Sequence, residues 1–461
     1  MDTEIGPLGG TQDAFYARPL PVRLPMMVRG EGIRLWDEAG KEYIDSSSGP
    51  MVSALGHCNP NVVAAMTRQA GRLDYAFTLV ARNPVNQHYT ERLAKLAGPG
   101  FERVNLTSGG SEAVDHALKL VRQLAIVGGE ASRRRIISLN PSYHGATIAS
   151  LAAGGNDLLL PFFDGFAVTA ETIPAPFSYR LPKGVTPEMS ALASARALEA
   201  KIVELGPETV LAFIIEAVGG LSTGAVVPPP EYFRSVRDIC TRYGVKLIFD
   251  EVLCGAGRTG KFFAAHHWPE ALPDIIVQAK GLGAGYAPIG ALLAPASDID
   301  RLAAAAGFNF TYSYNANPIA CAAGLAVLDE IERHDLCRNA ELRGAELRAG
   351  LEALKHTSPL VGDVRGLGLL LAVELVADQA SRQPMPRGFR ALDRLRHHGL
   401  EEGIMLYARE TAGGRFGQWI MIAPPLNVTS EEIALILSRL QRSLARLGGD
   451  ALAHKVLLQE T

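Results

Sequence analysis

Residues 246–260, KLIFDEVLCGAGRTG, decide between two interpretations of the fold. The stretch begins as an apolar strand, becomes acidic at Asp250 and Glu251, and ends in Gly255–Gly260, which matches the dinucleotide fingerprint G-x-G-x-x-G. In one interpretation this glycine segment is the phosphate-binding turn of a nicotinamide dehydrogenase. In the other, the chemistry lies at the carboxylates that close the strand. The segments on either side discriminate between the two.

Strand-like and helix-like segments alternate around this stretch, which is typical of a mostly parallel sheet covered by helices. The apolar runs are nearly continuous, as expected for strands that are buried on both faces. The helix expected over 231–244 has apolar residues at helical spacing, and Gly244 is placed to end it. The predicted strands are 101–108, 133–140, 210–218, 245–253 and 274–280. The sequence therefore predicts an α/β fold.

The pattern changes near residue 335. Long charged helices flank one glycine-punctuated apolar strand, expected over 364–376, and a last helix begins at Thr429, which has the capping-box spacing to Glu432. The first seventy or so residues lack the alternation. We therefore predict three parts: an N-terminal segment 1–75 that packs with the small domain, a large domain 76–334, and a small α+β domain 335–461.

Composition narrows the functional classes. The chain has 461 residues, of which 48% are hydrophobic and 20% are charged, as in large soluble proteins with two or more domains. Its net charge of −3, without a basic block, argues against binding to nucleic acid or to an anionic membrane surface. The start carries no signal-peptide pattern, and the five cysteines form no C-x-x-C. We expect a cytoplasmic protein without a metal site.

Polar residues follow four of the predicted strands at the carboxyl edge, where open α/β sheets bind ligands. They are Ser108–Glu112, Ser142–Gly145, Asp250 and Lys280. At the rim of an apolar sheet, desolvation lowers the pKa of a lysine and makes its amine nucleophilic. Taken singly, a solvated lysine and a capping or ion-paired aspartate are simpler interpretations. Taken together, these residues have one economical explanation, which is pyridoxal phosphate.

Pyridoxal phosphate needs an amine for a Schiff base and an anion beside its pyridine nitrogen. It also needs a phosphate cradle and flat packing partners. The turn at Gly109 and Gly110 offers backbone N–H groups at a helix start, and Ser111 adds a hydroxyl. Tyr143 can stack on the ring. Val252, two residues beyond Asp250, is expected on the same strand face.

With these motifs the sequence resembles the class III pyridoxal-phosphate aminotransferases, or ω-aminotransferase group, of fold type I. SGGSEAVDHALKLVR, SYHG, LIFDEVLCGAGRTGKFF, PDIIVQAKGLGAGYAPIGA and NANPIACAAGLAVL resemble the family's signatures in its order, and the resemblance runs from about Gly32 to the end. It implies catalytic roles for Lys280 and Asp250. The cofactor-binding residues that it implies are Gly110, Ser111, Tyr143, His144, Glu216, Asp250, Val252, Lys280 and Ser313.

The resemblance also implies a homodimer, possibly a tetramer, with active sites completed across the interface. The family places a phosphate-binding hydroxyl, commonly Thr, five residues before the Asn-Pro proline. Counting back from Pro318 gives Ser313, and Thr311 is the second candidate. Glu216 matches the family's strand-end glutamate, but Ala217 stands where the family usually has Pro, which leaves the detailed role of Glu216 open.

Substrate recognition is less defined. The implied reaction moves an amino group from an amine or ω-amino acid to a 2-oxo acid such as pyruvate or 2-oxoglutarate. Arg409 and Arg415 are candidates for the substrate carboxylate, although surface arginines explain them equally well. Tyr16, Trp36 and Ser48–His57 are expected near the substrate entrance.

Three alternatives remain beside the transaminase. An aminomutase or a decarboxylating relative would use the same fold and cofactor. A regulatory protein without catalysis would be expected to have lost Lys280 or Asp250. A dehydrogenase would place a diphosphate at Gly255–Gly260, beside two carboxylates that repel it, and no following strand supplies the acid for the ribose. We interpret the fingerprint match as coincidental.

Overall fold

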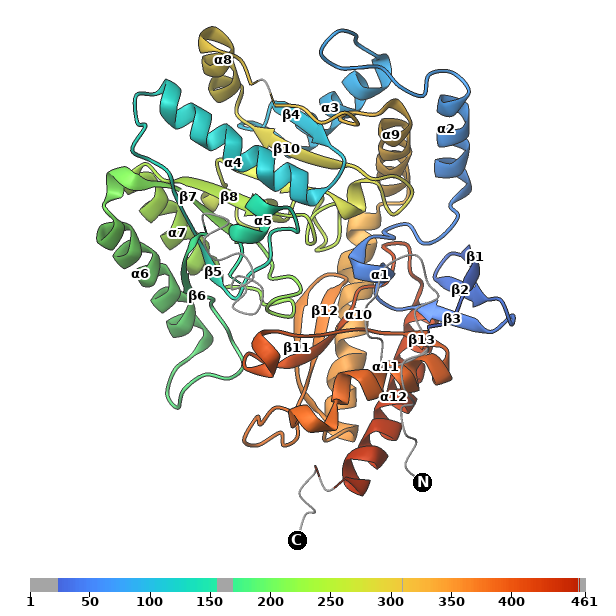
Figure 1. Cartoon of the computed structure of the whole chain (residues 1–461). Helices are drawn as coiled ribbons and strands as arrows, with labels where there is room; N and C mark the ends of the chain where they lie inside the picture. The colour runs from blue at the N-terminus through green and yellow to red at the C-terminus, as the bar shows by residue number, and fades with distance from the viewer. Residues whose placement is uncertain (1–23, 156–168, 309, 455, 457–461) are drawn as a thin grey trace, which may run out of the picture.

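The structure is a computed structural model that describes residues 24–155, 169–308, 310–454 and 456. Its centre is a seven-stranded sheet in the order β4-β10-β9-β8-β7-β5-β6 (Figure 1). All neighbouring strands are parallel except β10, which runs antiparallel to both β4 and β9. The strands are β4 (Arg103–Thr107), β5 (Arg135–Asn140), β6 (Glu171–Pro174), β7 (Val210–Glu216), β8 (Lys246–Asp250), β9 (Ile275–Gln278) and β10 (Gly290–Ala294). The α/β fold with a mostly parallel sheet is thus confirmed.

Helices bury both faces of this sheet, which explains the continuous apolar strands. In β7, Phe213 and Ile215 pack into one core, whereas Ala212 and Ile214 pack into the core on the opposite face. The helix 231–244 is confirmed, and Gly244 ends it with φ of 65° in the left-handed region. The helices of this part are α3 (Pro84–Ala97), α4 (Gly110–Val127), α5 (Ile148–Ala152), α6 (Pro187–Leu205), α7 (Pro230–Tyr243), α8 (Ala296–Ala305) and α9 (Pro318–Arg333).

A second, antiparallel sheet has the order β11-β12-β15-β14 and is formed by β11 (Val361–Leu367), β12 (Leu370–Leu375), β14 (Tyr407–Glu410) and β15 (Gln418–Ile422). The prediction of one strand over 364–376 is wrong, because the chain reverses at Gly368, whose φ is 58°. One face of this sheet packs with α10 (Leu336–Thr357), α11 (Ala391–Glu402) and α12 (Ser430–Ala453). Residues of its other face, including Trp419 and Met421, join the core beneath the large sheet.

The N-terminal segment contributes a third sheet. Strands β1 (Met27–Glu31), β2 (Arg34–Asp37) and β3 (Glu42–Asp45) pair in sequence, and β3 pairs in parallel with β13 (Ile404–Met405). Helices α1 (Ser48–Met51) and α2 (Pro60–Ala70) follow. The pairing of β3 with β13 joins segments that are some 360 positions apart in the sequence.

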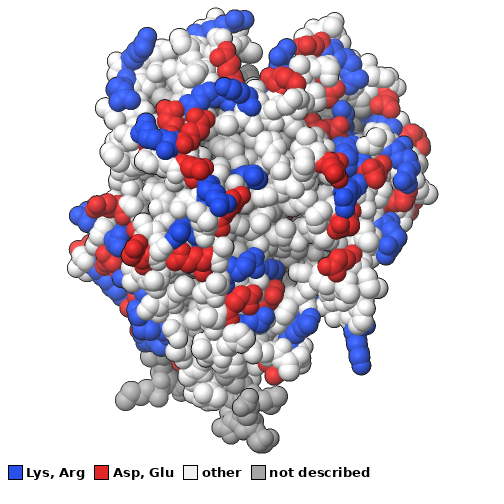
Figure 2. All heavy atoms as spheres, turned by 180° about the vertical axis from the view of Figure 1, so that it is seen from behind, with Lys and Arg blue, Asp and Glu red and all other residues white. Residues whose placement is uncertain are grey.

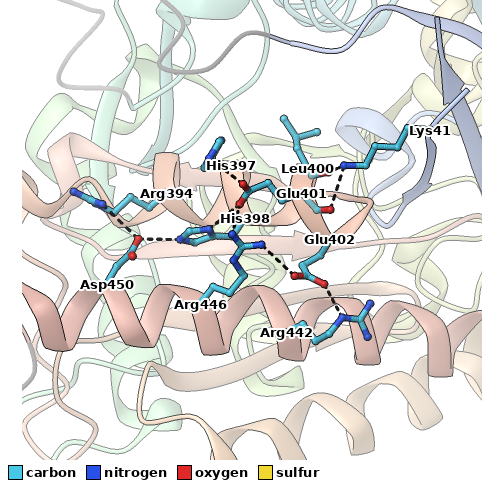
Figure 3. Close-up of polar contacts among 10 residues, drawn as sticks. All are labelled: Lys41, Arg394, His397, His398, Leu400, Glu401, Glu402, Arg442, Arg446 and Asp450. Carbon is cyan, nitrogen blue, oxygen red and sulfur yellow. Dashed lines mark hydrogen bonds and ion pairs between the residues drawn. The ribbon is translucent and has the colours of Figure 1, made fainter. Parts of the chain in front are cut away.

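Polar contacts reinforce this connection (Figure 3). The Lys41 ammonium donates to the carbonyls of Leu400 and Glu401 at 2.8 and 3.1 Å, so a residue of the β2–β3 turn caps α11. The His398 imidazole lies between α11 and α12, with Nε2 at 2.8 Å from a carboxylate oxygen of Asp450. The predicted capping box of Thr429 and Glu432 is present at the start of α12.

The surface agrees with the composition. On the face seen in Figure 2, basic and acidic residues are interspersed, without a broad region of one sign. Within the described residues, no helix has both the length and the apolar character needed to cross a membrane. The same residues contain no cluster of histidine, cysteine and acidic side chains suited to a metal ion.

Candidate active site

A cavity of about 270 Å³ lies at the carboxyl edge of the large sheet. The carboxyl ends of β4, β5, β7, β8 and β9 meet there because these strands run in the same direction. The predicted residues that line it are Gly110, Ser111, Tyr143, His144, Glu216, Asp250, Val252 and Lys280. Residues from five separate strand ends, dispersed over 170 positions of the sequence, are therefore brought into one space.

Lys280 follows β9 with φ of 44°, an unusual backbone conformation for a residue with a side chain. Among the described residues, none forms a hydrogen bond or an ion pair with its amine. Burial lowers the pKa of Lys280, while the negative charges of Asp250 and Glu216 act in the opposite direction. An amine that is half-buried, unpaired and more easily deprotonated than usual is suited to nucleophilic attack on a carbonyl carbon.

Asp250 is the last residue of β8 and is fixed on both carboxylate oxygens. His144 Nδ1 lies 2.8 Å from Oδ2, and the backbone N–H of Val252 donates to Oδ1 at 3.0 Å. Both side chains are buried, and the other ring nitrogen of His144, Nε2, is buried without a partner among the described residues. This arrangement presents a fixed anion to the cavity.

Glu216 ends the neighbouring strand, in register with Asp250. Its carboxylate accepts from the backbone N–H of Gly220 at 2.9 Å and from that of Tyr143 at 3.4 Å. Burial raises the pKa of Glu216 to about 7, although His144 and the two N–H donors act to lower it. Glu216 therefore titrates near neutral pH.

The start of α4 forms a group of hydrogen-bond donors at one end of the cavity. Gly109 is extended, and α4 begins at Gly110, which lines the cavity; the first N–H groups of an α-helix have no partner within the helix and can bind an anion. A Cβ on Gly110 would lie 2.7 Å from the Val252 side chain, so no larger residue fits there. The Ser111 hydroxyl accepts from the Ala146 N–H at 3.0 Å. This end of the cavity is suited to an anion such as a phosphate.

The geometry thus combines an unpaired amine, a buried anion and an anion cradle. Residues 15–444 match the family model described as aminotransferase class III. The chain belongs to the class III aminotransferases. Such enzymes use pyridoxal phosphate on the fold type I scaffold, and the cavity fits this group because it offers an amine, an anion for the ring and donors for the phosphate.

Relatives of this aminotransferase span several substrates. It is 35% identical over 442 residues to the diaminobutyrate–2-oxoglutarate transaminase of Halomonas elongata, covering 93% of this chain and 92% of that one. It is 31% identical over 424 residues to the taurine–pyruvate aminotransferase of Bilophila wadsworthia, covering 90% and 91%. A solved amine transaminase from an uncultivated Pseudomonas species, in its PLP-bound form, has a TM-score of 0.86 at 34% identity, covering 97% and 100%.

The glycine segment of this aminotransferase is a buried turn rather than a nucleotide site. No α-helix follows Gly255–Gly260; a short 3₁₀ turn, Ala264–His267, takes that place. Glu251 accepts from the backbone N–H groups of Ala264 and Ala265, both at 2.7 Å, and so fixes the turn. Arg258 donates to the Pro424 carbonyl, which connects the turn to the segment after β15. The dehydrogenase interpretation is therefore excluded.

Val252 reaches the cavity by a different route from the one predicted. Strand β8 ends at Asp250, so Val252 lies in the following turn and not on a strand face. It still lines the cavity and packs against Gly110 at the start of α4. Because Val252 lies in a turn, its backbone N–H can donate to the Asp250 side chain two residues earlier. In an extended strand, an N–H two residues further along would not reach that side chain.

The two hydroxyl candidates, Ser313 and Thr311, do not line the cavity of their own chain. Ser313 is exposed, and the Thr311 hydroxyl donates to the Tyr312 carbonyl at 3.3 Å. The loop that carries them is held by Tyr312, whose ring stacks on His116 with centroids 4.7 Å apart.

The two arginine candidates differ in position. Arg409, in β14, is paired in register with Trp419. Burial raises the pKa of Tyr143, and the positive charge of Arg409 acts in the opposite direction. Its Nε is buried without a partner among the described residues. Arg415 instead lies over the Phe416 ring, 4.5 Å from its centroid. Neither arginine lines the cavity, but Arg409 interacts electrostatically with Tyr143, which does.

The entrance residues are only partly as predicted. Of the stretch Ser48–His57, Val52 lines the cavity; Trp36 does not, and it lies under the Arg29 guanidinium at 3.8 Å. Tyr16 lies outside the described residues. The lining residues that the sequence did not reveal are apolar and lie in loops: Val218, Leu221, Leu253, Ala279, Ala287, Pro288 and Ile289.

Proposed function

We propose that this aminotransferase moves an amino group from an amine or ω-amino acid donor to a small 2-oxo acid, pyruvate or 2-oxoglutarate. The observation that carries this proposal is the unpaired Lys280 amine in one cavity with the buried Asp250–His144 pair. Relatives that act on 2-oxoglutarate and on pyruvate support both acceptors.

The roles of the site residues follow from their chemistry. When bound, pyridoxal phosphate supplies an aldehyde that condenses with amines and a pyridinium ring that takes up an electron pair from the substrate carbon. Lys280 would hold the coenzyme covalently and, once displaced by the donor amine, its free amine would move the proton at the substrate carbon. Asp250, fixed by His144, would keep the ring nitrogen protonated, and Tyr143 and Val252 would pack against the ring.

The phosphate would be held by Gly110 and Ser111 of one subunit and by a hydroxyl of the other. Ser313 of the partner subunit is the first candidate, and Thr311 of the partner subunit is the second. The exposure of Ser313 on its own chain supports this assignment, because an exposed side chain is free to enter a neighbouring site.

A homodimer in the cytoplasm is part of the proposal. Large apolar side chains are exposed next to the Ser313 loop, and Tyr75 and Tyr314 are in edge contact at 6.4 Å. A second copy of the chain would cover these side chains. The exposed set is Leu73, Tyr75, Phe77, Leu79, Val80, Phe310 and Tyr314.

Arg409 would bind the carboxylate of the acceptor. The support is its electrostatic interaction with Tyr143 and its buried Nε, which has no partner among the described residues, since a guanidinium fork matches a carboxylate in a bidentate contact. An amine donor without a carboxylate would not need this arginine. The two half-reactions should therefore depend on Arg409 to different degrees.

The test is a panel of amines and ω-amino acids against pyruvate and 2-oxoglutarate, with wild type and Arg409→Ala. We expect amino-group loss that requires a 2-oxo acid, and a KM for the acceptor that rises about 10- to 100-fold in the variant while the KM for a carboxylate-free amine changes little. Arg415→Ala is the matched control. Carbon dioxide release, or an amino shift within one substrate, would identify a decarboxylase or an aminomutase instead.

A further inference from the structure

A buried charge network joins the second sheet to the active-site side of the large sheet. Its centre is Glu374 of β12, of which 1% is exposed. Glu374 Oε2 lies 2.5 Å from Nη1 of Arg365 in β11, and Oε1 accepts from Arg180, which precedes α6. A carboxylate buried to this degree is stable when its charge is paired on both oxygens.

Arg365 extends the network to a turn of the large sheet. Its Nε donates to the Gly224 carbonyl at 2.6 Å and its Nη2 donates to the Thr223 carbonyl at 3.1 Å. The fit is close, because a Cβ on Gly224 would lie 2.7 Å from both Arg365 and the Trp419 ring. The Arg365 guanidinium therefore pairs with Glu374 within the second sheet and at the same time holds the backbone of this turn directly.

The turn, residues 219–225, forms part of the wall of the coenzyme cavity. Leu221 lines the cavity, and the Gly220 N–H donates to the Glu216 carboxylate at 2.9 Å. The turn is closed by the Gly224 N–H, which donates to the Gly220 carbonyl at 2.9 Å. Arg365 thus acts on Glu216 through Gly224 and Gly220.

The other arm of the network reaches residues 411–417. Arg180 donates to the Phe416 carbonyl at 3.5 Å. A Cβ on Gly417 would lie 2.1 Å from a Glu374 oxygen, so the backbone passes directly over the carboxylate. One buried carboxylate therefore fixes two separate segments that lie between the sheets.

We propose that Arg365 and Glu374 are positioning residues for the transamination: they fix turn 219–225 and, through the Gly220 N–H, hold the Glu216 carboxylate in place in the cavity. The proposal rests on the proposed function for its effect on activity. Its effect on the turn itself can be measured without any activity.

The consequence for pH dependence follows from the hydrogen bond of Gly220. This bond is one of the influences that lower the pKa of Glu216 against the larger effect of burial. The charged and titratable groups that act on Glu216 or are acted on by it are His144, Asp250, Tyr143, Lys280 and Cys254. If the turn loosens and the Gly220 N–H no longer donates to Glu216, the pKa of Glu216 rises. This holds whether the protonated or the ionised carboxyl is the active form.

The test uses Arg365→Lys and Glu374→Gln in the full-length, coenzyme-loaded protein. Two quantities are measured: the amide hydrogen exchange of residues 219–225, and the profile of kcat/KM over about pH 5.5 to 9. We expect exchange to accelerate about tenfold in the turn, and the inflection near neutral pH to move upward by about 0.5 to 1 pH unit. Glu374→Gln keeps the size of the side chain, so it provides a second variant should Arg365→Lys fold poorly.

Arg348→Lys is the matched control. Arg348 of α10 also donates to two backbone carbonyls of β11, those of Val364 and Gly366, but it does not reach the turn. We expect it to lower thermal stability without changing either quantity. The proposal is wrong if both network variants behave like this control, or if exchange accelerates while the inflection stays in place. Because exchange is read without turnover, a protein that shows no transaminase activity would count against the proposed function separately.

Discussion

Asp250 and Lys280 are charged groups in a place where burial disfavours charge, and each is accommodated differently. Both carboxylate oxygens of Asp250 have a partner, one in the His144 ring and the other in the Val252 N–H. Lys280 has no such partner among the described residues, and burial lowers the pKa of its amine. The Asp250 carboxylate is thereby held in one position, and the Lys280 amine is left free to act as a nucleophile.

Asp250→Asn tests the first assignment. The amide cannot keep a ring nitrogen protonated, so we expect kcat to fall at least about 100-fold while the coenzyme still binds. Single-turnover rates and a coenzyme titration measure the two effects. Turnover within about threefold of wild type would contradict the role of the Asp250 charge.

Gly110 and Gly109 form a matched pair for the cradle. Alanine at Gly110 places a Cβ 2.7 Å from Val252, whereas alanine at Gly109 meets nothing within 4 Å. We expect Gly110→Ala to lower the free energy of unfolding by about 1 to 3 kcal/mol and to weaken coenzyme binding. Gly109→Ala should lower both the stability and the coenzyme affinity less. Equal melting temperatures for the two variants would show that the helix start can adjust.

The sequence predicted the polar residues of the site better than its apolar wall. Asp250 and Lys280 stand out because polar side chains end very apolar strands. Leu221 and Ile289 line the same cavity, but an apolar residue in a loop looks the same whether it faces a cavity or a core. The pairing of His144 with Asp250 joins positions more than 100 residues apart, and no local pattern encodes it.

At the scale of elements, α4 connects the site to the Ser313 loop. Its first turn forms the cradle, and His116, two turns later, stacks on Tyr312 of that loop. His116 Nδ1 lies 2.9 Å from the Asn105 side-chain oxygen in β4, and the imidazole is fully buried. Helix α4 thus supports the anion cradle of its own subunit's cavity and also the Ser313 loop, which is proposed to reach the cavity of the partner subunit.

The buried imidazole makes this region sensitive to acid. Burial lowers the pKa of His116 to about 4, so the unfolded chain binds this proton more readily than the folded one. Stability from this residue is complete above its unfolded pKa and is lost as the pH falls from about 6.5 toward 4. We expect the free energy of unfolding of the wild type, measured with urea, to fall by about 2 to 3 kcal/mol over this pH range. In His116→Gln this fall should be absent. The same pH dependence in both proteins would refute the assignment.

Secondary structure was predicted where one signal dominated. Gly244 ends α7 and Thr429 caps α12 as expected, because both are local chemical signals. The hairpin β11–β12 was missed because Gly368, where its turn lies, was interpreted as a glycine within one apolar strand. Strands β6 and β10 were also missed, since they are short and their pairing depends on distant strands.

For the whole molecule, the proposed dimer makes the site a product of two chains. Val80 is 81% exposed and follows Tyr75, Phe77 and Leu79 in the sequence, of which Tyr75 contacts Tyr314 next to Ser313. We expect Val80→Glu to shift the protein toward monomers and to weaken coenzyme binding about 10-fold or more, because a charge in an apolar interface is poorly solvated. Sedimentation velocity and a coenzyme titration measure both effects.

The control for that variant is Val203→Glu. Val203 lies on α6 and is 57% exposed, outside the apolar set around the Ser313 loop. Val203→Glu should leave the assembly and the coenzyme binding unchanged. A monomeric wild type with full coenzyme affinity would contradict the shared site.

The domain limits 1–75, 76–334 and 335–461 stay a prediction. The N-terminal strands pair with β13, while other residues of the second sheet join the core of the large sheet.

The central claim is that Lys280 binds the coenzyme covalently in a cavity where Asp250 meets the same ring. The most direct measurement is the visible absorption spectrum of purified wild type and Lys280→Ala with pyridoxal phosphate, before and after borohydride, followed by mass spectrometry of the peptide that contains residue 280. The account predicts a visible band in wild type that borohydride removes, with the coenzyme mass fixed on Lys280, and neither in the variant. Identical spectra in the two proteins, or the coenzyme mass on another lysine, would contradict it.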